Sequence, residues 1–335
     1  MEKLNGNKTY LITGGLGFIG ANFIKYILEK YPNIKIVNLD LCTYAANPKY
    51  LKELKSDSRY IFVKGDISNL NLVRKLFKKF DFDYCINFAA ESHVDNSTAN
   101  PALFAKTNVL GTTSLLQAAR EAWEISERKF KQGKRFVQIS TDEVYGSIKR
   151  GFFSENSPLS PKNIYSSTKA AADLIVKSFF DIYGFPCLIT RSCNNYGPNQ
   201  NQEKLIPRCF KNAKKLKPIE IYGDGNQIRD WIYVLDNCAA IDLVCQSGKL
   251  GEIYNIASND EKTNNFVAKK IINYVNKNIN NKCSENLICY VKDRPSHDFR
   301  YGLDCAKISG ELGFKPKVSF DDGLEKTLNW YKENM

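Results

Sequence analysis

Residues 10–20 read YLITGGLGFIG, an apolar run followed at once by a glycine-rich turn. The spacing G-x-x-G-x-x-G lets the backbone turn tightly, approach a pyrophosphate closely and aim the first amides of a helix at its charge. The stretch therefore predicts a strand, a dinucleotide-binding turn and a helix. Its candidate cofactor ligands are Gly14, Gly17, Phe18, Ile19 and Gly20.

A carboxylate lies at the end of the second apolar run, where Asp40 follows Gly20 by twenty positions. At that place a carboxylate accepts hydrogen bonds from both hydroxyls of an adenosine ribose and repels a 2′-phosphate. The pattern therefore favours NAD over NADP as the cofactor. We expect Asp66 and Ile67, at the end of the third apolar run, to flank the adenine.

The first half of the chain alternates short apolar runs with amphipathic segments, which is typical of a parallel sheet with helices on both faces. The fold class is therefore α/β, a doubly wound parallel sheet of the NAD-binding Rossmann type with a smaller C-terminal substrate lobe. We expect strands at residues 10–13, 35–40, 60–64, 84–88, 135–140 and 186–190. The longest helices are expected at Leu103–Phe130 and Tyr165–Tyr183.

The regular alternation loosens after Tyr196 into segments punctuated by proline and glycine. We therefore divide the chain into a Rossmann domain at residues 1–196 and a mainly substrate-binding lobe at residues 197–335. Residues 231–245 and 252–256 regain a helix-then-strand rhythm. A segment near 226–260 is accordingly expected to return to the main sheet.

Composition narrows the possible classes further. A chain of 335 residues with 43% hydrophobic and 25% charged residues fits a folded enzyme. The absence of a long apolar run and the polar N-terminus predict neither a membrane span nor a secretory signal, which makes the cytoplasm the default location. The ten cysteines contain no C-x-x-C pair and are interpreted as reduced thiols. The two histidines, His93 and His297, are far apart, which argues against a metal site. The lysines behind the net charge of +12 are scattered along amphipathic segments, so no nucleic-acid partner is expected.

A Tyr-x-x-x-Lys couple, Tyr165 and Lys169, begins the second long helix. Positions i and i+4 share a helix face, so Lys169 can reach a nicotinamide ribose while its ammonium lowers the pKa of the Tyr165 phenol. The phenol can then act as a base near neutral pH. With the glycine turn, with Ala89 and Ala90 after the fourth strand and with Ser140 after the fifth, this couple resembles the extended short-chain dehydrogenase/reductase family.

Two adjacent carboxylates, Asp142 and Glu143, follow Thr141 at the end of the fifth strand, where ligands of open α/β sheets collect. Epimerases and simple reductases of that family need only the Ser/Thr and the Tyr-Lys couple, since their chemistry occurs at one carbon. Elimination of water across two carbons also needs a base for a proton and an acid for the departing hydroxyl. Two carboxyl groups in unlike environments can divide those roles.

Segments spread over nearly the whole chain resemble the dTDP-glucose 4,6-dehydratase family. They are 89–95, 140–146, 194–198, 203–207, 222–225, 228–231, 293–295 and 297–298. The resemblance implies a nucleoside-diphosphate hexose as substrate and the loss of one water. It also implies a homodimer formed by the two long helices.

The same resemblance implies a role for each matching residue. Tyr165 would take the proton of the C4 hydroxyl, with Thr141 hydrogen-bonded to the same oxygen. Glu143 would remove the C5 proton and Asp142 would protonate the departing C6 hydroxyl, while NAD carries a hydride from C4 to C6. The implied substrate ligands are Ser92, Asn194, Glu203, Lys204, Arg229, Asn255, Arg294, His297 and Tyr301.

Residues 199–202 read NQNQ, where the family usually carries an aromatic residue and a proline, and Ser296 replaces a glycine. An amide-rich loop suits an N-acetyl group or another hydroxyl pattern, so UDP-N-acetylglucosamine and UDP-glucose stay open beside dTDP-glucose. Asp142 disfavours 4-epimerisation and UDP-glucuronate decarboxylation. The intact Thr141, Tyr165 and Lys169 argue against a catalytically silent protein that only binds a sugar nucleotide or NAD.

Overall fold

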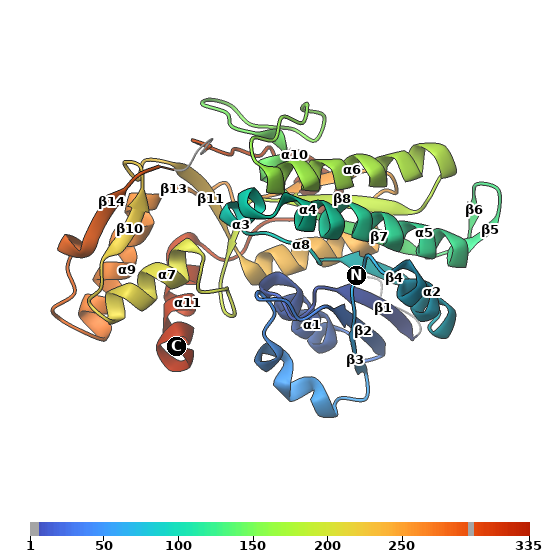
Figure 1. Ribbon diagram of the computed structural model, residues 1–335, viewed down its shortest axis with the longest axis horizontal. Coiled ribbons are helices and arrows are strands. Elements are labelled where there is room, and N and C mark those ends of the chain that lie inside the picture. The colour runs from blue at the N-terminus through green and yellow to red at the C-terminus, as the bar shows by residue number, and fades with distance from the viewer. Residues whose placement is uncertain (1–6, 294–297) are drawn as a thin grey trace.

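A seven-stranded parallel sheet forms the centre of the computed structural model, which describes residues 7–293 and 298–335 (Figure 1). The strand order β12-β8-β7-β4-β1-β2-β3 runs outward in both directions from the neighbours β1 and β4, and this reversal opens a crevice at their carboxyl ends. The strands are β1 Lys8–Thr13, β2 Ile34–Asp40, β3 Tyr60–Lys64, β4 Tyr84–Asn87, β7 Arg135–Thr141, β8 Cys187–Ser192 and β12 Ile253–Ile256. The expected parallel sheet is confirmed.

Helices cover both faces of this sheet and bury two separate apolar cores. On one face Ile24 and Ile27 pack in the same core as Ile241 and Val244. The other face includes Leu115, Leu116 and Val176 in its core. The helices concerned are α1 Phe18–Lys30 and α8 Val234–Ser247 on the first face, with α2 Leu70–Lys79, α5 Thr112–Trp123 and α6 Ile164–Tyr183 on the second.

The smaller lobe has its own core around Tyr196, Phe210, Trp231 and Phe320. Its strands are β9 Asn194–Tyr196, β11 Ile228–Tyr233 and β13 Glu261–Thr263 in one sheet, with β10 Ile219–Tyr222 and β14 Ile288–Val291 in another. Its helices are α7 Leu205–Lys214, α9 Asn264–Asn278 and α11 Phe320–Asn334. Figure 1 shows these elements gathered beside the main sheet, at the end where α3 (Val94–Ala99) lies.

The chain re-enters the main sheet between parts of the smaller lobe. Helix α8 packs against α1, and β12 then pairs with β8 in parallel register. Helix α10 (Ala306–Leu312) covers this edge. Helix α8 begins at Val234 and not at Trp231, because Trp231 belongs to β11 and pairs with Asn194 of β9. We propose a domain division near residue 196 with 234–256 as the returning segment.

The expected helix Leu103–Phe130 is too long by seven residues, and this prediction is wrong at its C-terminal end. A short helix α4 (Pro101–Phe104) continues through a π-helical segment at Ala105–Gly111 into α5, which ends at Trp123. Strands β5 (Glu124–Ser126) and β6 (Lys129–Phe130) then form a hairpin. The reason is tertiary packing: Phe130 contacts Phe185 at 5.5 Å between ring centroids, and Phe185 stacks on Trp123 at 5.8 Å. Among the described residues no helix is long and apolar enough to cross a membrane.

Candidate active site

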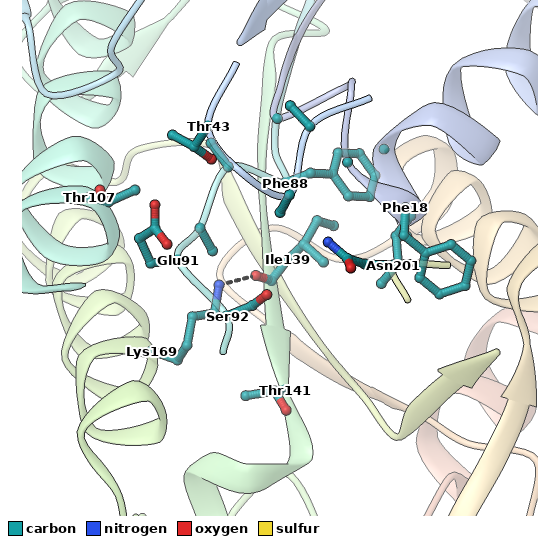
Figure 2. Close-up of a pocket in the computed structure, with 18 of the residues that line it drawn as sticks. Phe18, Thr43, Phe88, Glu91, Ser92, Thr107, Ile139, Thr141, Lys169 and Asn201 are labelled. Atoms are coloured by element: carbon teal, nitrogen blue, oxygen red, sulfur yellow. Dashed lines mark hydrogen bonds between the residues drawn. The ribbon is translucent and has the colours of Figure 1, made fainter. Parts of the chain in front are cut away.

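A cavity at the carboxyl ends of β1, β4 and β7 is lined by every residue that the sequence predicts to bind the cofactor (Figure 2). At the floor of the cavity, the backbone of the glycine turn lies close to the backbone at Ala89. Gly14 has φ +66°, and a Cβ there would lie 2.7 Å from the backbone nitrogen of Ala89. A Cβ on Gly20 would lie 2.5 Å from the carbonyl oxygen of Gly14. The turn therefore needs glycine, and its bare backbone fits the pyrophosphate of a dinucleotide.

Asp40 is almost fully buried at the rim of this cavity and ties two loops together. Its Oδ2 accepts a hydrogen bond from the backbone nitrogen of Leu16 at 2.9 Å, and its Oδ1 accepts one from Cys42 at 2.8 Å. Burial raises the pKa of Asp40. Each oxygen keeps a second lone pair, so the carboxylate can still accept from ribose hydroxyls.

One acidic residue, Asp66, and one apolar residue, Ile67, border the end of the cavity that is expected to hold the adenine. Asp66 accepts from the backbone nitrogen of Ser68 at 2.8 Å and pairs with Lys106 at 3.0 Å. Ile67 is buried against Gly111, where a Cβ would meet its Cδ1 at 2.5 Å. The residues present thus fit NAD at every predicted position.

The Tyr-Lys couple lies on the first turns of α6, which a capping box at Asn163 begins. Lys169 donates from Nζ to the carbonyl oxygen of Ile139 at 2.5 Å, as Figure 2 shows. Burial lowers the pKa of Lys169 to about 8. The Lys169 ammonium is thus desolvated and held at the cavity wall.

The phenol of Tyr165 is buried close to the two carboxyl groups. Burial, followed by the nearby Glu143 and Asp142, raises the pKa of the phenol, whereas a hydrogen bond with the Thr141 side chain lowers it. Without a further positive charge beside it, Tyr165 stays protonated at neutral pH.

The two adjacent carboxyl groups occupy unlike environments. Asp142 is 2% exposed, its Oδ1 accepts from the Thr141 hydroxyl at 3.1 Å, and its Oδ2 has no partner among the described residues. Burial, with Glu143 beside it, raises the pKa of Asp142 to about 8. Glu143 accepts from the Asn163 side-chain amide at 3.1 Å, and burial raises its pKa as well. Asp142 is therefore held as an acid at neutral pH, whereas Glu143 has a donor that supports its charge.

A second cavity adjoins the first and opens toward the smaller lobe. Its lining includes the predicted substrate residues Ser92, Asn194, Glu203, Lys204, Arg229 and Tyr301, together with Glu143. The Arg229 guanidinium lies 4.5 Å from the centre of the Tyr301 ring and donates to the carbonyls of Ile228, Phe299 and Asp298. All but Arg229 and Tyr301 also line the first cavity, so the two cavities share a junction.

Asn255 is not brought to either cavity, and this is a correction. Its side-chain oxygen accepts from the Tyr145 hydroxyl at 2.8 Å, and its amide nitrogen donates to the carbonyls of Phe153 and Asp304. The side chain is fully buried and supports the strand end instead of a ligand. Arg294 and His297 lie outside the described residues.

The sequence patterns do not single out several amide residues at the two cavities. Asn163 donates to Glu143, and its N-cap position just before a helix was the available signal. Asn195 and Gln200 line the first cavity. From the sequence, Gln200 is only one member of the polar stretch 199–202.

The fold and the site together define the class. A parallel sheet with a glycine turn, an acidic residue at the end of β2 and a Tyr-x-x-x-Lys couple beside the strand ends is the architecture of an NAD-binding short-chain dehydrogenase/reductase. The vicinal acid pair adds groups that a simple hydride transfer does not require.

Comparisons with known proteins narrow this class. A model of the GDP-mannose 4,6 dehydratase family matches residues 11–327. The dTDP-glucose 4,6-dehydratase of Haemophilus influenzae is 45% identical over 331 residues, covering 97% of this chain and 98% of that protein. The chain belongs to the NAD-dependent nucleotide-sugar 4,6-dehydratases, which are lyases.

Solved structures agree with this family. The dTDP-glucose 4,6-dehydratase DesIV of Streptomyces venezuelae, with NAD and TYD bound, superimposes with a TM-score of 0.89 at 41% identity, covering 97% of each chain. The Bacillus anthracis dTDP-glucose 4,6-dehydratase in complex with NAD gives a TM-score of 0.87 at 41% identity, covering 98% of this chain and 97% of that one.

Proposed function

We propose that this chain converts dTDP-glucose into its 4-keto-6-deoxy product by removing one water. The observation that carries the proposal is the buried acid Asp142 beside Glu143, in a cavity that also holds Tyr165 and Thr141. Relatives named dTDP-glucose 4,6-dehydratase at 40–45% identity over nearly the whole chain support this substrate.

Each side chain takes the part of the reaction that its protonation state allows. When bound, NAD supplies reversible hydride transfer, out of C4 and back to C6. Tyr165 holds the C4 oxygen with Thr141 and accepts the proton of that hydroxyl, which requires a positive charge close to the phenol because burial and the two carboxyl groups raise its pKa. The C4 ketone acidifies the C5 proton, which Glu143 removes. Asp142 gives its proton to the departing C6 hydroxyl, so water leaves. Glu143 returns its proton to C5 when C6 regains the hydride, so no net oxidation occurs.

A direct assay tests the reaction and the substrate together. The purified protein would be incubated separately with dTDP-glucose, UDP-glucose and UDP-N-acetylglucosamine. Loss of one water would be followed by mass spectrometry, and the 4-keto product by its absorbance in alkali. Product from dTDP-glucose supports the proposal, and product from a UDP-sugar alone would replace the substrate. No water loss with bound NAD would contradict the reaction.

We further propose a homodimer through one helical face. Leu103 and Leu110 near α5 and Leu174 and Ile182 on α6 are 37–59% exposed, although they are large and apolar. Figure 1 shows α4, α5 and α6 lying alongside each other, and contacts join α5 to α6. A second copy would bury this face.

We also propose a cytoplasmic location, which the ten free cysteines support because they suit a reducing compartment.

A further inference from the structure

The loop of residues 197–204, here called the junction loop, is fixed to both lobes where the two cavities meet. Asn22 of α1 donates from its side chain to the Pro198 carbonyl at 2.9 Å. Tyr331 of α11 donates from its hydroxyl to the Gly197 carbonyl at 3.1 Å. A loop held from both sides presents its side chains in defined positions to a ligand that spans the junction.

Gln200 is the residue of this loop whose side chain has a buried acceptor with no donor. Its Nε2 donates to the backbone carbonyl of Asn195 at 2.9 Å, whereas its Oε1 has no partner among the described residues. The residue is only 8% exposed. Because a backbone carbonyl can only accept, the amide nitrogen must face Asn195, and the oxygen is therefore the end of the amide without a partner in the described part of the chain. A buried acceptor without a donor is destabilising, so this position suits a ligand that supplies the missing donor.

Its neighbours in the NQNQ stretch behave differently. Asn199 has φ +68°, which asparagine tolerates better than most residues, and this turn precedes the buried Gln200. Asn201 lines the cofactor cavity but not the second one, and Gln202 is exposed and accepts from Lys211 at 2.8 Å. Gln200 is the member of the stretch that lines both cavities.

The position of Gln200 at the junction indicates which group of the substrate could donate a hydrogen bond to it. The side chains that also line both cavities are Ser92, Glu143, Asn194, Glu203 and Lys204. They include the proposed base, so the hexose must lie at this junction while Asp142, Thr141 and Tyr165 hold its C4 and C6 oxygens. The hydroxyls at C2 and C3 remain to be bound.

We propose that Gln200 determines substrate specificity by accepting, at Oε1, a hydrogen bond from the C2 or C3 hydroxyl of the hexose. This inference rests on the proposed function, since it requires a nucleoside-diphosphate hexose in the site. A 2-acetamido sugar would also offer a donor at C2, whereas a deoxy sugar at the contacted carbon would leave the buried acceptor unpaired.

Deoxy analogues test the contact without relying on loss of activity alone. The kcat/KM for 4-keto product would be measured with dTDP-glucose and with its 2-deoxy and 3-deoxy forms. The variants are Gln200→Met, which removes the acceptor, Gln200→Glu, which keeps one, and Gln202→Ala as the matched control. We expect the wild type to lose 10- to 100-fold with one deoxy sugar. Gln200→Met should lose a similar factor with dTDP-glucose and nothing further with that deoxy sugar, while Gln200→Glu keeps the preference and Gln202→Ala behaves as wild type.

Other outcomes are equally decisive. An equal loss for Gln200→Met with all three sugars, no loss for the wild type with either deoxy sugar, or weaker NAD binding by Gln200→Met in calorimetry would overturn the assignment. If the wild type forms no 4-keto product from any of the sugars, the proposed function fails on its own. Calorimetric Kd values for the same three nucleotide sugars then decide on Gln200 by the same pattern.

Discussion

Asn163 joins helix α6 to Glu143 through the two ends of one amide. Its oxygen accepts from the backbone nitrogen of Ser166 at 2.8 Å and caps the helix, while its nitrogen donates to Glu143 at 3.1 Å. Tyr165 and Lys169 lie on that helix, so this side chain sets the distance between the Tyr-Lys couple and the proposed base.

Replacing Asn163 with Asp should separate these two functions. Aspartate caps a helix as well as asparagine, so the thermal midpoint should change little. The donor to Glu143 is lost and a like charge is added, so kcat/KM should fall about 10- to 100-fold. The control is Asn69→Asp, which changes the N-cap of α2 in the same way. Equal activity for the two variants would show that the Asn163 bond to Glu143 does not matter.

The pH profile of kcat/KM should be bell-shaped. Activity requires protonated Asp142, whose pKa is raised to about 8, so activity should fall as pH rises through that value. The loss of charge on Lys169, whose pKa is lowered to about 8, acts in the same direction. The acid limb reports ionisation of Glu143 and should lie above the usual glutamate range, because burial raises its pKa. In Asp142→Asn, the fall in the residual kcat/KM above about pH 8 should become much smaller. If that fall is unchanged, a group other than Asp142 causes it.

Asp142 should also lower stability in a pH-dependent way. A carboxyl group whose pKa is higher in the folded state binds more protons folded than unfolded, so its contribution to the free energy of unfolding falls as pH rises from about 4 to 8. Asp142→Asn should therefore be more stable than wild type, with a gain that grows by about 1 to 3 kcal/mol between pH 5 and pH 8. Urea unfolding at several pH values measures this. The exposed Asp224, whose pKa lies below its usual value, should show no growing gain in Asp224→Asn.

Asp40 should govern both cofactor choice and the loops around it. In Asp40→Asn the amide nitrogen must face one of the two backbone N–H groups that now donate to the carboxylate. We expect about 1–3 kcal/mol of lost stability and a 10- to 100-fold weaker Kd for NAD. Binding of NADP should weaken less, since the charge that repels its 2′-phosphate is gone. Calorimetry with both dinucleotides tests this, and equal losses for the two would argue against a role in selecting NAD.

The helical face should control the oligomeric state. Leu174→Lys places a charge where a second copy would pack, and light scattering after size exclusion should show a shift from dimer to monomer. Phe62→Lys, at an exposed position of β3, is the matched control and should leave the mass unchanged. A wild type that is already monomeric at working concentration would contradict the proposed dimer.

The sheet and the cofactor cavity could be predicted from the sequence because they depend on local patterns. Strand periodicity, the glycine spacing and Asp40 all act within a few residues of their own position. The hairpin after Trp123 could not be predicted, since it depends on Phe130 meeting Phe185, 55 positions later.

The site was harder to predict wherever a side chain has several possible partners. Asn255 matches a family position, yet Tyr145 and two backbone carbonyls use its hydrogen-bonding groups. Among the described residues the Gln200 side-chain oxygen lacks a donor, because the amide nitrogen faces the Asn195 carbonyl. No sequence motif indicates that contact.

The late arrival of β12 has a consequence for biosynthesis. When a ribosome has released residues 1–196, the sheet ends at β8, which pairs with β7 but has an unpaired outer edge because Ile253–Ile256 have not yet been made. An open edge of this kind invites pairing with other nascent chains. The first domain can therefore finish folding only after about sixty further residues have emerged, and a chaperone that shields β8 during that interval would raise the yield of active enzyme.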